Sequence, residues 1–210
     1  MRKPGLEPLL AHPAIWRGRS VARTATHSTG FPPLDDALPG GGWPLAALTE
    51  ILTPHPGAGE LRLLIPFLRA LGAAVPPRWV AWIAPPFEPY APALAAAAVP
   101  PERQLVVRTT QPLWALEQTL DSGACAVALA WLERVQAATR ELRRLQLATQ
   151  RQGTPAFVFR AARAATQASP AELRIAFEPQ AGGARLQLLK SRGGARAPFE
   201  LRWEVDHGTT

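Results

Sequence analysis

Stretches of continuous apolar residues alternate with amphipathic stretches through the middle of the chain. The apolar stretches predict buried strands at residues 46–52, 79–84, 104–108, 124–130 and 154–160. Apolar positions at helical spacing predict helices between them, at residues 60–73, 87–98, 111–122 and 133–152. Strands that alternate with helices in this way are typical of a parallel sheet covered by helices.

The C-terminal part of the chain has a different pattern. Residues 172–179, 185–190 and 199–205 predict three further strands, with glycine turns between them. Short turns join antiparallel strands, so the predicted fold is α/β, with a mostly parallel central sheet flanked by helices and antiparallel C-terminal strands. We expect residues 1–26 to form a helical segment and a linker, and residues 27–210 to form one domain.

Positive charge is concentrated in the last third of the chain. The 210 residues include 23 Lys and Arg against 16 Asp and Glu, a net charge of +7. Residues 134–210 carry thirteen basic and six acidic side chains, so the whole excess lies there. This asymmetry favours an acidic partner or nucleic acid, and a solvated arginine-rich surface explains it equally well.

Nothing in the sequence indicates a membrane span or a secretory signal. No apolar run approaches the roughly 20 residues of a membrane helix, and prolines interrupt the apolar stretch near the N-terminus. The single cysteine, Cys125, lies in an apolar run and has no disulfide partner within the chain. These features predict a cytoplasmic protein with no membrane contact.

The turn after the first predicted strand of the parallel sheet has the frame of a phosphate-binding loop. A P-loop joins a strand to a helix through G-x-x-x-x-G-K-[ST], whose backbone N–H groups, Lys and hydroxyl hold phosphate and magnesium. In that frame Pro54 stands at the first Gly, Gly59 at the second, Glu60 at the Lys and Leu61 at the hydroxyl residue. Gly57 and Gly59 keep the backbone freedom that the turn requires.

These substitutions predict a degenerate loop that holds no nucleotide. Pro54 and Pro56 have no N–H to donate, and Leu61 has no hydroxyl for magnesium. The Glu60 carboxylate would repel phosphate, and at a helix N-terminus we expect it to occupy the anion site itself. Because the histidines and Cys125 also lack metal-ligand spacing, we expect no catalytic residue, no cofactor and no metal.

The order of motifs around this loop resembles the RecA recombinase core. The similarity rests on Ser28-Thr29-Gly30, Leu34-Asp35, the glycines before Trp43-Pro44, and Leu48-Thr49-Glu50-Ile51. The Trp-Pro pair and the degenerate loop are similar to the ImuA family, RecA-like proteins that are tied to mutagenic translesion DNA synthesis and related to the SulA cell-division inhibitors. The resemblance covers about residues 12–205.

The resemblance implies a RecA-like fold in a protein without ATPase activity. The family's magnesium-ordering acid would follow residues 124–130, where this chain has Trp131, and its catalytic Glu would stand at Pro85-Pro86. The nearest acids to the first position, Asp121 and Glu133, lie at the start of that strand and beyond its end. The implied role is that of a pseudo-ATPase accessory factor in SOS-induced, error-prone lesion bypass. The implied partners are an inactive ImuB-like polymerase homologue, an error-prone polymerase complex, and RecA or single-stranded DNA.

Two alternatives to this role remain open. One is a SulA-like cell-division inhibitor that binds the tubulin-like protein FtsZ. The other is a true ATPase with an unorthodox loop, which the substitutions at Glu60 and Leu61 disfavour.

Six basic side chains are the candidates for binding a partner or DNA. They are Arg140 and Arg144 on the helix predicted at 133–152, Arg160 and Arg163 at the end of the strand predicted at 154–160 and just beyond it, and Lys190 and Arg192 in a Gly-rich turn. Few aromatic residues lie among them, so base stacking is not strongly supported and a protein partner is favoured slightly over DNA. A solvated arginine face is the alternative interpretation.

Overall fold

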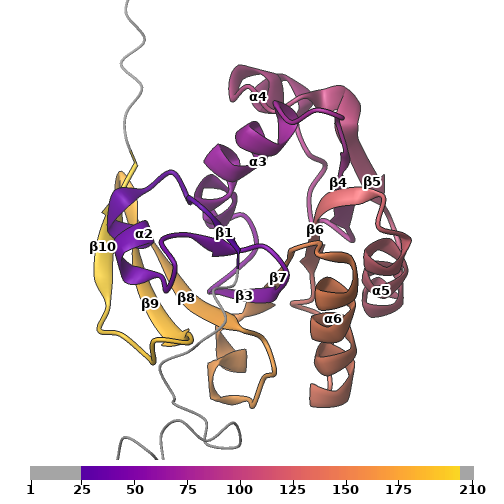
Figure 1. Cartoon of the computed structure of the whole chain (residues 1–210). Helices are drawn as coiled ribbons and strands as arrows, with labels where there is room; N and C mark the ends of the chain where they lie inside the picture. Colours follow the sequence, from indigo (N-terminus) through magenta and orange to yellow (C-terminus); the bar gives the residue numbers. More distant parts are fainter. Residues whose placement is uncertain (1–24, 204–210) are drawn as a thin grey trace, which may run out of the picture.

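The computed structural model describes residues 25–203, whose strands form one large sheet and a small ribbon (Figure 1). In chain order the large sheet contains β3 (Leu48–Thr53), β4 (Trp79–Ile83), β5 (Gln104–Val107), β6 (Cys125–Trp131), β7 (Ala156–Ala161), β8 (Leu173–Gln180), β9 (Gly183–Lys190) and β10 (Phe199–Arg202). Its eight strands are arranged in the order β10-β9-β8-β3-β7-β6-β4-β5. Each strand overlaps one of the strands predicted from the sequence.

The central part of this sheet is parallel. Strand β3 pairs in parallel with both of its neighbours, β7 and β8, and the pairs β7–β6, β6–β4 and β4–β5 are parallel as well. The pairs β8–β9 and β9–β10 are antiparallel. The prediction of an α/β fold with a mostly parallel sheet and antiparallel C-terminal strands is therefore confirmed.

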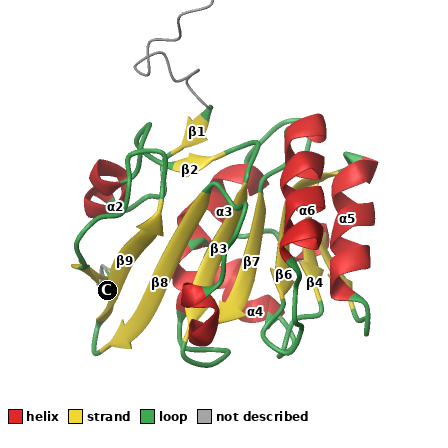
Figure 2. Cartoon of the chain, turned by 90° about the horizontal axis from the view of Figure 1, so that it is seen from below, coloured by secondary structure: helices red, strands yellow, loops and turns green. Residues whose placement is uncertain are grey.

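Helices cover both faces of the parallel strands (Figure 2). Helices α5 (Pro112–Ser122) and α6 (Thr139–Gln152) lie side by side on one face, and α3 (Ile65–Gly72) and α4 (Ala91–Ala96) pack on the other. Successive strand residues enter opposite layers, so Leu129 packs on the α3 side and Ala130 on the α5 side. Within residues 25–203 no helix is long and apolar enough to cross a membrane.

The helix predicted at residues 60–73 begins in a different form. Residues Glu60–Leu63 make a 3-10 helix, η1, and α3 begins only at Ile65. Pro66 has no N–H to donate to the carbonyl of Arg62, so regular α-helical bonding cannot run through this point. The segment still buries Leu63, Leu64 and Phe67 against the sheet.

The helix predicted at residues 133–152 is also shorter, because α6 begins at Thr139. The Glu141 carboxylate accepts the backbone N–H of Ala138 at 2.8 Å, which is half of a capping box and fixes the start of the helix. Residues 133–138 therefore form a connection. Glu133 lies in this connection, next to the end of β6.

The first described residues form a small antiparallel ribbon beside the short helix α2 (Pro32–Ala37). Strand β1 (Thr26–His27) pairs with β2 (Trp43–Pro44). A Cβ atom at Gly42 would lie 2.1 Å from the His27 carbonyl oxygen, so only glycine fits there. Of the segment predicted at 1–26, residues 1–24 lie outside the described part, and Thr26 belongs to β1.

A buried carboxylate joins the three central strands. Glu50 on β3 is fully buried and forms ion pairs with Arg160 on β7, at 3.0 Å, and with Arg174 on β8, at 2.7 Å. Ser169 donates a further hydrogen bond to Glu50 at 2.7 Å. The Arg174 guanidinium also donates to backbone carbonyls of residues 164, 165 and 167 and so anchors the crossover from β7 to β8.

We expect Arg174→Ala to destabilise the protein strongly, since it leaves part of the Glu50 charge buried without its partner. Loss of one partner from a buried pair costs about 3–5 kcal/mol. The matched control is Arg151→Ala, which breaks an exposed pair with Asp121 and should cost about 0–1 kcal/mol. Urea denaturation measures both, and equal losses would show that the Glu50 network does not hold these strands together.

Candidate functional site

The degenerate loop lies at the carboxyl end of β3, in the centre of the parallel sheet. It runs from Pro54 to Gly59, and η1 begins at Glu60. Gly57 and Gly59 have φ angles of +74° and +95°, values that L side chains rarely adopt. A Cβ atom at Gly57 would also lie 3.0 Å from Cε2 of Phe87. The positive φ therefore favours glycine at both positions, and a side chain at residue 57 would also press on the Phe87 ring.

The Glu60 carboxylate folds back onto the loop. Its side chain is only 1% exposed, and Oε1 accepts the backbone N–H of Gly57 at 3.1 Å. In a P-loop such N–H groups bind phosphate. Here the chain's own carboxylate takes that donor, while Oε2 has no hydrogen-bond partner among residues 25–203.

Glu133 is a second acid at the loop, although in the sequence it lies beyond the end of the strand predicted at 124–130. The Thr53 hydroxyl, at the end of β3, donates to Oε1 of Glu133 at 3.4 Å. Burial is the largest cause that raises the pKa of Glu133, and the negative charge of Glu60 raises it further. The hydrogen bond from Thr53 and the positive charges of Arg134 and His55 act in the opposite direction and lower it. The fold therefore brings an acid that lies two residues beyond Trp131 to the end of β3, beside the loop.

A largely apolar cavity opens beside the loop, and we call it the loop cavity. It has a volume of about 230 Å³ and is lined by Glu60, Leu61, Trp82, Phe87, Tyr90 and Trp131, among others. Trp131 stacks between Trp82 and Phe159, and its indole N–H has no partner within the described chain. Glu88, at the rim, is paired with Arg108.

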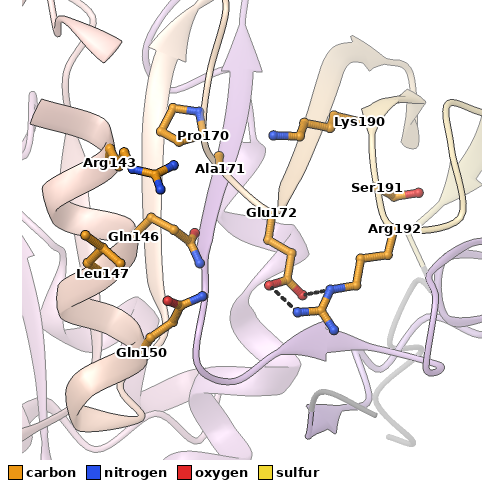
Figure 3. A pocket seen from close by; sticks show the side chains of 10 residues that line it. All are labelled: Arg143, Gln146, Leu147, Gln150, Pro170, Ala171, Glu172, Lys190, Ser191 and Arg192. Carbon is orange, nitrogen blue, oxygen red and sulfur yellow. Dashed lines mark hydrogen bonds and ion pairs between the residues drawn. The ribbon is translucent and has the colours of Figure 1, made fainter. Parts of the chain in front are cut away.

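A second, polar site lies between α6 and the beginning of β8 (Figure 3). This basic groove has a volume of about 360 Å³ and is lined by Arg143, Gln146, Gln150, Glu172, Lys190 and Arg192, with four further residues. Arg192 pairs with Glu172 at 3.1 Å, and Lys190 donates to the Ser169 carbonyl at 2.8 Å. Three cations face one carboxylate, so the groove carries net positive charge.

The six predicted basic residues do not form one surface. Lys190 and Arg192 lie in the basic groove, and Arg140 is exposed at the start of α6. Arg144 makes a bidentate pair with Glu117 of α5, and Arg163 donates to the Glu133 carbonyl. The sequence prediction missed Arg143, which lines the groove.

Arg160, which the sequence offers as a candidate for binding a partner or DNA, does not lie on an accessible face. Its side chain is buried, at 3% exposure for the residue, and is held by Glu50 and by the Gln167 amide oxygen. Glu50 lies on a strand remote in sequence, so the pairing could not be read from the neighbours of Arg160.

Metal-ligating side chains are scattered through the described part of the chain. Between residues 25 and 203 no three His, Cys, Asp or Glu side chains gather as they would around a metal ion. Cys125 is buried, and burial raises the pKa of its thiol despite the nearby charge of Arg78. A buried thiol of this kind is not an activated nucleophile.

Comparisons with known proteins add little to this description. No family model and no curated protein matches the sequence. Among solved structures, SulA from Pseudomonas aeruginosa aligns with 54% of this chain and 97% of its own length, at 24% sequence identity and a TM-score of 0.43. This likeness is too weak to assign a fold family or a function.

We expect Glu133→Gln to stabilise the protein in a way that grows with pH. The pKa of Glu133 is raised above its ordinary 4.5, so the folded protein holds this proton more tightly than the unfolded chain does. The contribution of Glu133 to the free energy of unfolding of the wild type therefore falls as pH rises from 4.5 through the folded pKa. The amide in the variant does not ionise, so the variant does not lose this free energy.

Urea denaturation at about pH 4 and about pH 7 measures this difference between variant and wild type. Glu102→Gln, at an exposed acid away from the loop, is the control. A stability difference that is the same at both pH values would contradict the raised pKa.

Proposed function

We propose that this protein is a non-catalytic, RecA-like accessory factor in SOS-induced, error-prone translesion DNA synthesis. It acts by binding an inactive, ImuB-like polymerase homologue and, through it, an error-prone polymerase complex. The observation that carries this proposal is the Glu60 carboxylate, which occupies the Gly57 N–H in the loop where a nucleotide phosphate would bind. The ImuA resemblance of the sequence supplies the biological role.

Two features of the fold support the RecA-like part of the proposal. The loop follows a central strand, β3, that has a parallel neighbour on each side, and it leads into a helix packed on the sheet. In open α/β sheets, ligand sites form at the carboxyl ends of the strands. The degenerate loop stands at such a place, although its residues no longer suit phosphate.

The pseudo-ATPase part of the proposal rests on the chemistry of the loop. Glu60 and Glu133 bring two carboxylates to the place of a nucleotide's phosphates, and Pro54 and Pro56 offer no N–H. Glu133 could approach a magnesium ion, but Leu61 offers no hydroxyl to complete the usual magnesium site. Without a lysine or an arginine from this loop, the charge of a triphosphate would remain unbalanced.

The basic groove is the surface that we assign to the protein partner. It collects Arg143, Lys190 and Arg192 around one acid, and its open, polar lining suits an acidic segment. No aromatic side chain lines it, so single-stranded nucleic acid would find no stacking platform there. We therefore favour an acidic peptide of the polymerase homologue over DNA.

We expect the purified protein to bind a purified ImuB-type polymerase homologue and to bind FtsZ no more tightly than a control protein. Biolayer interferometry with the ImuB-type protein, FtsZ, RecA and a single-stranded oligonucleotide measures all four. Binding to FtsZ without binding to the polymerase homologue would contradict the proposal and favour the cell-division alternative.

The sharper form of this assay reverses charge in the groove. Arg143→Glu with Lys190→Glu should weaken the association at least tenfold and reduce its salt dependence. Arg185→Glu with Arg202→Glu changes the net charge equally at exposed positions on β9 and β10 and is the matched control. Equal affinity of the two double variants would mean that the groove is only a solvated surface.

A further inference from the structure

The loop cavity contains a buried negative charge that the fold only half satisfies. One oxygen of Glu60 accepts the Gly57 N–H, and the other is buried without any hydrogen-bond partner among residues 25–203. An isolated carboxylate is costly to bury unless it is paired and hydrogen-bonded. The neighbouring Glu133 adds to this cost, since the two charges repel.

The cations of the described chain do not neutralise this charge. Arg134 and His55 lie near enough to Glu133 to lower its pKa, but neither makes an ion pair with Glu60 within residues 25–203. Arg108 is already bonded to Glu88, which lines the cavity. A positive group from outside the chain would therefore find an unmatched carboxylate oxygen.

The remaining walls of the loop cavity suit a planar cation on an apolar stem. Phe87 and Tyr90 are 65% and 69% exposed, although large aromatic side chains are usually buried. A guanidinium stacks on aromatic faces, is more weakly hydrated than an ammonium and forms forked bonds to carboxylates. Trp131 also lines the cavity, and its unpartnered indole N–H could donate to an acceptor such as a peptide carbonyl.

We infer that the loop cavity binds an arginine side chain of a partner protein. The guanidinium donates to Oε2 of Glu60, the aliphatic stem packs on Phe87 and Tyr90, and a carbonyl of the same segment accepts from Trp131. The place where a P-loop would bind an anionic phosphate thus binds a cation in this protein. This inference rests on the proposed function, because the cavity must hold no nucleotide.

A divalent metal ion is the competing occupant, and its chemistry fits less well. The carboxylates that line the cavity are Glu60 and Glu88, and Glu88 is already paired with Arg108. The described residues contain no cluster of three metal-ligating side chains, and most of the lining is apolar. Mg²⁺ requires six oxygen ligands in near-octahedral geometry. An arginine needs only an acceptor such as the unpartnered Oε2 of Glu60.

The test uses the full chain and the peptide acetyl-Leu-Arg-Leu-amide. Its neutral isostere, acetyl-Leu-citrulline-Leu-amide, keeps the shape and removes the charge. Titrations are followed by the ¹H–¹⁵N signal of the Trp131 indole, assigned by comparison with Trp131→Phe. We expect saturable shifts with the arginine peptide and at least tenfold weaker binding of the citrulline peptide.

The same titration with Glu60→Gln should also be at least tenfold weaker, whereas Glu102→Gln should bind as the wild type does. Equal binding of the two peptides to the wild-type protein would overturn the inference, and that comparison stands even if Glu60→Gln fails to fold. Displacement of the arginine peptide by millimolar MgCl₂, at constant ionic strength, would also overturn it in favour of a metal site.

Failure here is distinguishable from failure of the proposed function. If the arginine peptide does not bind and the ImuB-type protein still does, only the cavity inference fails. If ATP–Mg²⁺ shifts the Trp131 signal saturably, the pseudo-ATPase proposal fails with it.

Discussion

The charge network around Glu50 is the interaction on which the centre of this fold depends. A carboxylate at the middle of β3 is held by one guanidinium from β7 and another from β8. The pairing fixes β3 between its two parallel neighbours and ties the crossover segment to them through the Arg174 bonds. Because β3 ends at the degenerate loop, this network also sets the position of Glu60 and of the Thr53 hydroxyl that meets Glu133.

The two buried glutamates of this region, Glu50 and Glu60, differ in how well the fold pairs their carboxylates. Glu50 has two arginines and a serine hydroxyl as partners, so its charge is matched within the fold. Glu60 has one backbone N–H and a neighbouring carboxylate. A charge that the fold leaves half satisfied, next to exposed aromatic rings, is a feature of recognition more than of stability. This contrast supports both parts of our proposal, a loop that holds no phosphate and a surface that binds a partner.

Most of the fold could be predicted because its strands are continuous apolar runs. Short apolar runs such as WVAWIA, followed by prolines, are typical of strands in a sheet that is covered on both faces. The first residue of each helix was harder to predict, since it depends on single hydrogen bonds such as the one that Glu141 accepts and the one that Pro66 cannot donate.

The positions of the site residues were the hardest to predict from the sequence. Whether Arg160 is exposed depends on Glu50, which lies 110 positions earlier in the chain, and Glu133 approaches the loop only because α6 starts after it. Its place two residues after a buried parallel strand was the signal that could have identified Glu133.

The central claim is that this loop has lost its affinity for nucleotides, and calorimetric titration of the purified full chain with ATP and Mg²⁺ tests it most directly. Glu60 in the phosphate position, two prolines in the loop and the missing Lys and hydroxyl predict no measurable heat of binding up to millimolar ATP. Saturable binding with a micromolar dissociation constant, about −8 kcal/mol, would contradict the account.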